Sequence, residues 1–219
     1  MKRLLKFGFG ILILPACFIQ SCVFYQSLRH LNKFEGDEVY FLYGVILYFL
    51  IHTLLFKPVF LYVLAHESVH AIAAKAFGGK VQSVKASSKG GETKTTKSNF
   101  IILLAPYFTP LYTLLLCAAT IVVVRFFQFE KFRDLFFLLI GFSLTFHVVM
   151  TVDFLKTKQP DLMKLGDLLS IEMIYLVNLL VIILVFGFVF PGVSPKEYFV
   201  QAITSTEMAY RQIYNQLFL

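Results

Sequence analysis

The sequence predicts an all-α membrane protein, a polytopic helical bundle of about six spans with a short β-hairpin loop and a C-terminal amphipathic helix. Hydrophobic residues make up 58% of the chain and charged residues only 15%. The mean hydropathy is +0.75, and several apolar runs approach the length that crosses a bilayer. These values exclude an ordinary soluble domain and predict an integral, multi-pass membrane protein.

We expect one polytopic domain over residues 1–219, with spans at about 7–25, 39–56, 58–77, 99–124, 135–155 and 168–190. The N-terminus resembles a signal peptide, since Met1-Lys2-Arg3 precedes an apolar run with Leu14-Pro15-Ala16-Cys17 inside it. That run continues to Tyr25 and exceeds a typical signal core. The expectation is therefore an uncleaved first span.

Two loops interrupt the apolar pattern. Lys57-Pro58 alone separates the second and third spans, which predicts a tight hairpin or a sharp kink. Residues 78–98 carry two Gly pairs, and Val, Ser and Thr flank the second pair, which indicates a β-hairpin. This segment holds five lysines. It is either a solvated loop that contacts lipid headgroups or a hairpin whose free edge pairs with an extended substrate.

Prolines mark three further positions. Pro106 and Pro110 lie inside the fourth span and predict a kink, which either is purely structural or opens backbone toward a cavity. Pro160 suits a helix start with Asp161 in the first turn. Ser194 to Glu197 forms a capping-box pattern that begins a helix over about 195–218, which we expect to lie at the membrane interface.

The net charge of +7 points to anionic lipid headgroups rather than nucleic acid as the partner of the basic residues. No helix-turn-helix or Arg-rich aromatic pattern suggests nucleic-acid binding. The three cysteines, Cys17, Cys22 and Cys117, lie in apolar runs and form no CxxC pair, so buried packing is expected for them.

The motif with the most chemical content is His66-Glu67-Ser68-Val69-His70, an HExxH sequence inside an apolar segment. Composition alone gives roughly 0.004 expected matches in a chain of this length. Two histidines four residues apart share a helix face and can bind zinc. Glu67 beside them is suited to act as a general base on water that the metal activates. Interior histidines bonded to backbone carbonyls are the alternative, but three adjacent ionisable groups would then need non-metal partners in hydrocarbon.

Hydrolytic zinc sites take three protein ligands, so one more must come from elsewhere in the chain. His147, Asp153 and Asp161 are the candidates. Asp161 begins a helix, whose N-terminus favours the ionised carboxylate, yet physical reasoning leaves Asp153 and Asp161 nearly equal. Each also has a purely structural interpretation, since Asp153 can balance nearby lysines and Asp161 can simply support a helix start.

This combination resembles the site-2 protease family of intramembrane zinc metalloproteases. The matching features are the HExxH sequence, the glycine pairs Gly78-Gly79 and Gly90-Gly91, and Gln159-Pro160-Asp161-Leu162 with Gly166 and Ser170. The resemblance covers roughly residues 58–178. It implies a zinc peptidase that cleaves within or near the membrane and takes a downstream aspartate, Asp161, as its third ligand. The Asn-Pro-x-x-x-Leu-Asp-Gly motif of many members is missing here.

The resulting hypothesis is a zinc metalloendopeptidase with Glu67 as catalytic base, His66, His70 and Asp161 as metal ligands, and transmembrane proteins or peptides as substrates. No substrate-binding residue is predicted. Two alternatives are a non-catalytic membrane protein that binds a metal or partner, and a membrane zinc hydrolase of non-peptide substrates. The resemblance also implies a cytosolic hairpin. With six spans, this would place Lys2, Arg3 and Lys6 outside, against the positive-inside rule, unless one span is re-entrant.

Overall fold

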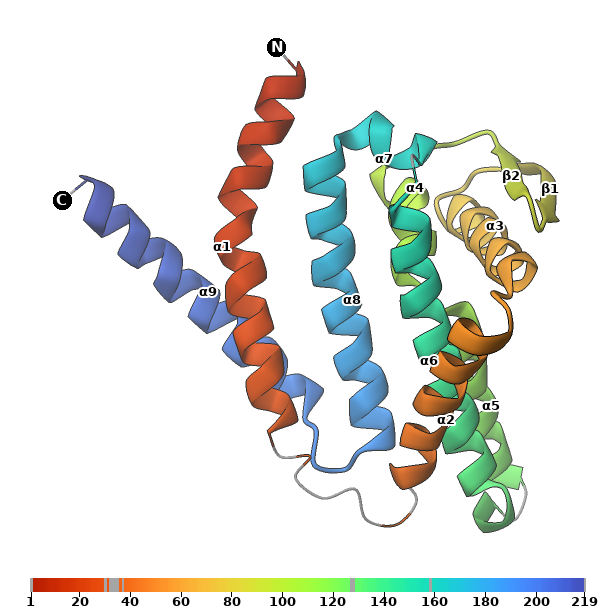
Figure 1. The fold of residues 1–219 in the computed structure, drawn as a ribbon. Coiled ribbons are helices and arrows are strands. Elements are labelled where there is room, and N and C mark those ends of the chain that lie inside the picture. Colours follow the sequence, from red (N-terminus) through yellow and green to blue (C-terminus); the bar gives the residue numbers. More distant parts are fainter. Residues whose placement is uncertain are drawn as a thin grey trace. The chain divides into compact units, whose positions relative to one another are not determined.

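The computed structural model describes residues 2–29, 31, 36, 38–126, 129–157 and 159–218. Most of these residues are helical, as the sequence predicts (Figure 1). Contacts within the chain divide it into two compact units, residues 1–33 with 164–219, and residues 34–163. The expectation of a single domain stays a prediction.

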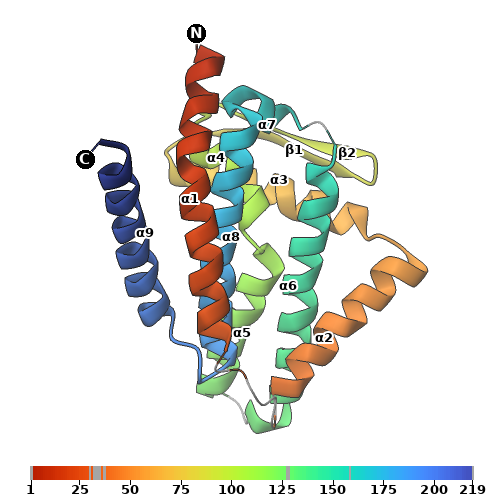
Figure 2. The same cartoon turned by 60° about the vertical axis from the view of Figure 1, so that its left-hand side comes forward.

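The first unit consists of three long helices, α1 (Lys2–Leu28), α8 (Asp167–Val189) and α9 (Pro195–Phe218). α1 packs against both α8 and α9 (Figure 2). The Ser21 hydroxyl of α1 lies 2.6 Å from the Tyr175 hydroxyl of α8. Gln20 accepts a hydrogen bond from Tyr198 of α9. Polar side chains thus join these apolar helices, as in other membrane bundles.

The expected C-terminal helix is present with its cap. The backbone N–H of Glu197 donates to Ser194 Oγ over 3.2 Å, which satisfies one of the open donors at the start of α9. Large apolar residues remain exposed along α9, including Phe199, Ile203 and Leu217. Its location at the membrane interface stays a prediction.

The second unit contains the remaining elements. In chain order they are α2 (Glu38–Leu50), the π-helical turn η1 (Ile51–Leu55), α3 (Val59–Ala76), β1 (Val81–Ser87), β2 (Gly90–Thr95), α4 (Phe100–Phe108), α5 (Leu111–Phe126), the 3-10 turn η2 (Phe129–Lys131), α6 (Arg133–Leu155) and the start of α7 (Pro160–Leu165). α6 packs against α2 on one side and α5 on another. A buried aromatic cluster, Tyr48, Tyr62 and Phe146 with Met150, joins α2, α3 and α6.

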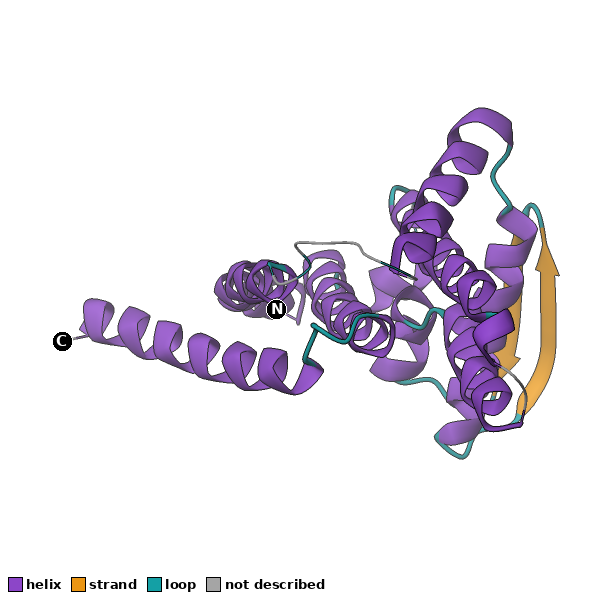
Figure 3. Cartoon of the chain, turned by 90° about the horizontal axis from the view of Figure 1, so that it is seen from below, coloured by secondary structure: helices purple, strands orange, loops and turns teal. Residues whose placement is uncertain are grey.

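The predicted β-hairpin is confirmed. β1 and β2 pair antiparallel, with Val84 opposite Thr93 and Lys85 opposite Glu92 (Figure 3). Gly90 has a φ of +139°, a conformation that side-chain-bearing residues rarely adopt, and it follows directly on the turn between the strands. Both strands contact α3, so the hairpin lies against the helix that carries the HExxH sequence.

The chain is an integral, multi-pass membrane protein. Among the described residues, four helices are long and apolar enough to cross a membrane, and they lie in α1, α2 with η1, α6 and α8. α4 and α5 pass the same test only as a pair, bent by 71° where the sequence predicts a proline kink, so they form either a broken fifth span or a re-entrant loop. The expected count of about six is therefore somewhat high. The difference is α3, whose hydropathy is lowered by His66, Glu67, His70 and Lys75.

Candidate metal centre

α3 places the two histidines of the HExxH sequence on one face. The ring centroids of His66 and His70 are 4.9 Å apart. Pro58 directly precedes the helix, where its missing N–H costs nothing. His66 and Glu67 are buried, with 9% and 7% exposure, so both ionisable groups are held away from solvent.

Asp161 reaches the same point from α7. Its Oδ2 lies 3.3 Å from His70 Nε2. One ligand atom from each of His66, His70 and Asp161 lies within 4.8 Å of the other two. The structure therefore brings together the three residues that the sequence hypothesis named, although two of them are more than ninety positions from the third.

The hydrogen bond of His70 defines which of its nitrogens faces Asp161. His70 Nδ1 is 2.8 Å from the carbonyl oxygen of Ile102 in α4. A carbonyl can only accept, so Nδ1 carries the proton and donates. In a neutral ring, Nε2 then directs a lone pair toward the carboxylate of Asp161. Two electron-rich groups at 3.3 Å need a cation between them.

A metal ion fits this requirement better than a proton does. A proton is shared between two groups, whereas three donor groups converge here. Two imidazoles and one carboxylate are a ligand set that zinc takes in hydrolytic sites. The backbone carbonyl that holds His70 also matches the usual support of a metal-bound histidine.

Glu67 points toward the hairpin rather than into the ligand cluster. Thr93 Oγ1 of β2 donates to Glu67 Oε2 over 2.6 Å. Gly91 approaches the same side chain so closely that a Cβ atom there would lie 2.6 Å from Glu67 Oε1. A residue larger than glycine would push Glu67 aside. Among the described residues, Oε1 makes no hydrogen bond, so one oxygen of the carboxylate is left for chemistry.

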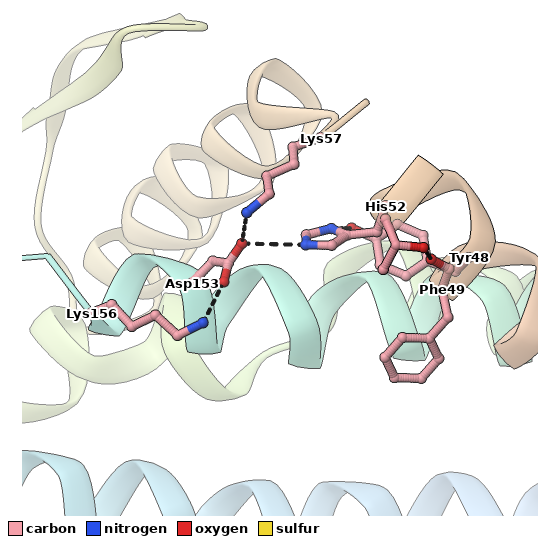
Figure 4. A network of polar contacts seen from close by, with 7 residues as sticks. Tyr48, Phe49, His52, Lys57, Asp153 and Lys156 are labelled. Carbon is pink, nitrogen blue, oxygen red and sulfur yellow. Dashed lines mark hydrogen bonds and ion pairs between the residues drawn. The ribbon is translucent and has the colours of Figure 1, made fainter. Parts of the chain in front are cut away.

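Asp153, the rival third ligand, belongs to a different cluster (Figure 4). Its two oxygens accept hydrogen bonds from Lys57 over 2.5 Å and from Lys156 over 2.8 Å. His52 Nε2 lies 3.3 Å from it, and Tyr48 bonds the other nitrogen of His52. The π-helical turn η1 brings His52 to this point. Asp153 thus balances lysines, as one of the two sequence interpretations anticipates.

His147, the other candidate ligand, is buried in α6. It lines a small cavity that His66 also lines, together with Ser143 and the residues at the break between α4 and α5. It is not part of the three-residue cluster found among the described residues.

Sequence reasoning missed the residues that hold the site. Thr93 positions Glu67, Gly91 makes room for it, and the Ile102 carbonyl orients His70. The second glycine pair and the Thr-rich run did indicate a hairpin. Nothing in their pattern shows which helix that hairpin covers.

Residues 39–120 match the model of the family described as Peptidase M50B-like. The match spans less than half of the chain, so it shows what this region is similar to. The match confirms the resemblance to the site-2 proteases and covers α2, α3 with the HExxH sequence, the hairpin and most of the broken helix pair. A search of curated proteins and a search of solved structures each gave no significant match. Asp161 lies beyond the M50B-like region, so its assignment depends on the geometry described above.

Proposed function

We propose that this protein is an intramembrane zinc metalloprotease that hydrolyses peptide bonds within or near transmembrane segments. The observation that carries the proposal is the convergence of His66, His70 and Asp161, with the Glu67 carboxylate on the same helix and an M50B-like sequence around it. The multi-pass fold places this site in a membrane protein, so transmembrane segments are the proposed substrates and lipids its surroundings.

His66, His70 and Asp161 would hold the zinc ion. Zinc in such a site polarises the substrate carbonyl and lowers the pKa of a water molecule. Glu67 takes the proton from the attacking water on Oε1, the oxygen that Thr93 leaves open, and later delivers it to the leaving nitrogen. The short hydrogen bond from Thr93 fixes the carboxylate during both transfers. The hairpin over Glu67 helps to keep bulk water from the base.

The test is the Glu67→Gln variant in purified protein, assayed on a transmembrane peptide. Loss of the base should reduce cleavage by at least about a hundredfold, while the zinc content stays at the wild-type level. Glu92→Gln is the matched control, since Glu92 is an exposed hairpin residue paired with Lys94, and it should cleave normally. Full activity of Glu67→Gln would contradict the assignment.

A parallel assay on lipid vesicles separates the peptide hypothesis from a hydrolase of non-peptide substrates. The proposal expects turnover of the peptide and none of the lipid. A protein that binds zinc but turns over neither would instead support the non-catalytic alternative.

A further inference from the structure

The break between α4 and α5 leaves the last carbonyls of α4, that of Pro106 among them, without helical partners. In a continuous helix the carbonyl of Pro106 would accept a hydrogen bond from the N–H of residue 110. Pro110 has no N–H, so this bond cannot form. The chain instead becomes extended at Thr109, with φ −103° and ψ 100°, and the two helix axes bend by 71°.

A small cavity lies beside this break. Pro106, Thr109 and Pro110 line it, together with residues that include His66, Ser143 and His147. The space open to the centre of a water molecule is about 10 Å³. This is close to the smallest volume that holds one water, and far below what a peptide side chain requires.

His66 has an unsatisfied nitrogen. Its Nδ1 is fully buried and has no hydrogen-bond partner within the described chain. His70, by contrast, has the Ile102 carbonyl on its Nδ1. A histidine that binds a metal through Nε2 carries a proton on Nδ1, and this proton is ordinarily bonded to a carbonyl, a carboxylate or a water. The two histidines of the site are therefore supported in different ways.

Most hydroxyl groups that line the cavity already have partners. Tyr62 pairs with Thr151, Tyr112 donates to the Leu61 carbonyl, and Ser143 pairs with Thr113. Pro110 leaves the carbonyl of Pro106 without its helical donor, and Pro106 lines the cavity. A water needs at least two polar partners to remain in a buried site.

We propose that one buried water molecule occupies this cavity, accepts the hydrogen bond of His66 Nδ1–H and donates to the Pro106 carbonyl. Pro110 thereby serves the metal centre, because the N–H that it lacks leaves the Pro106 carbonyl open as the acceptor for the water that supports His66. This inference rests on the proposed function, because it requires that His66 binds the metal through Nε2. It gives Pro110 a role that neither the ligand set nor the M50B-like match assigns.

The first test compares Pro110→Ala with the wild type in zinc affinity, measured on the purified full-length chain by competition with a chelator. Alanine restores the N–H at residue 110, which captures the Pro106 carbonyl in a helical bond and removes the water's acceptor. The zinc Kd should rise about tenfold, as is typical when the support of a ligating histidine is lost. Pro15→Ala is the matched control, since Pro15 lies inside α1 in the other unit, and its zinc Kd should not change.

An unchanged zinc Kd in Pro110→Ala would overturn the water bridge while leaving the proposed function intact. A wild-type protein that binds no zinc, or a His66→Ala variant that binds it as well as the wild type, would instead overturn the metal site itself. The two failures are thus distinguishable.

A second measurement covers the case in which Pro110→Ala does not fold. Solid-state NMR of the zinc-loaded wild type with ¹⁵N-labelled histidine identifies His66 as the signal that is lost in His66→Ala. Its Nδ1 should carry a proton that receives magnetisation directly from water. A deprotonated Nδ1, or a proton in contact with protein groups alone, would overturn the proposal.

Discussion

Asp153 and Asp161 are eight residues apart, yet their carboxylates have opposite surroundings. Asp153 contacts two ammonium groups, whereas Asp161 faces the lone pair of His70 Nε2. Two lysine ammonium groups already neutralise the Asp153 carboxylate, so it gains little from binding a metal. A carboxylate directed at an imidazole nitrogen gains most from one.

The two aspartates should therefore differ in zinc binding. Asp161→Asn removes a ligand and should weaken zinc binding by at least about a hundredfold, more than the loss of a supporting contact causes. Asp153→Asn should leave the zinc content at the wild-type stoichiometry. Both are measured as zinc per purified protein and by chelator competition. Loss of zinc from Asp153→Asn with retention in Asp161→Asn would reverse the ligand assignment.

For individual residues, the sequence predicts contacts within one helix but misses contacts between elements that are distant in the chain. The spacing of His66 and His70 places them on one helix face because helical periodicity is a local property. The pair Asp153 and Lys156 shares a helix at i, i+3, a pattern that favours an ion pair rather than a ligand. The contacts of Thr93 with Glu67 and of Ile102 with His70 span 26 and 32 positions, so they depend on how the hairpin and α4 fold back.

Among elements, the tightest packing joins α2 to α6. A Cβ atom at Gly44 would lie 2.0 Å from the Leu138 carbonyl oxygen, and one at Gly141 would lie 2.1 Å from that of Phe41. Each helix thus presents a glycine to the backbone of the other, the arrangement that lets membrane helices approach closely. This contact fixes α6, the helix that leads toward Asp161.

Gly44→Ala should consequently destabilise the protein although alanine is the better helix former. We expect a loss of about 3 kcal/mol, at the upper end of overpacking costs, because the clash is with backbone. Unfolding in a detergent titration, followed by circular dichroism, measures it. Gly8→Ala is the matched control, since a Cβ at Gly8 has nothing within 4 Å, and it should be neutral or slightly stabilising. Equal stability of the two variants would contradict the close-packing interpretation.

The sequence predicts the helices and their breaks better than it predicts which helices cross the membrane. The break follows from the missing N–H of Pro110, whereas the bend of 71° is a tertiary property that the proline positions do not give. The length of α3 and its apolar flanks predict a span. The ionisable residues that give it chemistry are the same residues that lower its hydropathy below that of the other spans.

On the scale of the whole molecule, the long uninterrupted apolar runs predict the fold class, since such runs satisfy their backbone in lipid as helices, whereas the strands of a closed barrel alternate apolar and polar residues. Composition does not predict the number of crossings, and this number decides the membrane orientation. With six spans the N-terminal basic residues and the lysine-rich hairpin fall on opposite sides. If α1 and α2 cross the membrane and α3 does not, the two crossings return the chain to the side of the N-terminus before the hairpin begins.

Five crossings therefore bring Lys2, Arg3 and Lys6 to the side that also holds the hairpin lysines, which satisfies the positive-inside rule. The bent pair α4–α5 and then α6 cross once each, so Lys131 between them lies on the opposite side and Lys156 returns to the hairpin side. We predict that single cysteines at Lys6, Lys89 and Lys156 share one side and that a cysteine at Lys131 lies on the other.

The measurement is labelling with a membrane-impermeant maleimide in intact cells and in inverted vesicles, after Cys17, Cys22 and Cys117 have been replaced by serine. Lys6→Cys and Lys89→Cys should react only in inverted vesicles, and Lys131→Cys only in intact cells. If Lys6→Cys and Lys89→Cys react from opposite sides, α3 crosses the membrane fully and the six-span arrangement holds. Reaction from one side makes α3 a segment that enters the membrane without crossing it, which would leave Glu67 and the three proposed zinc ligands reachable by water from the hairpin side.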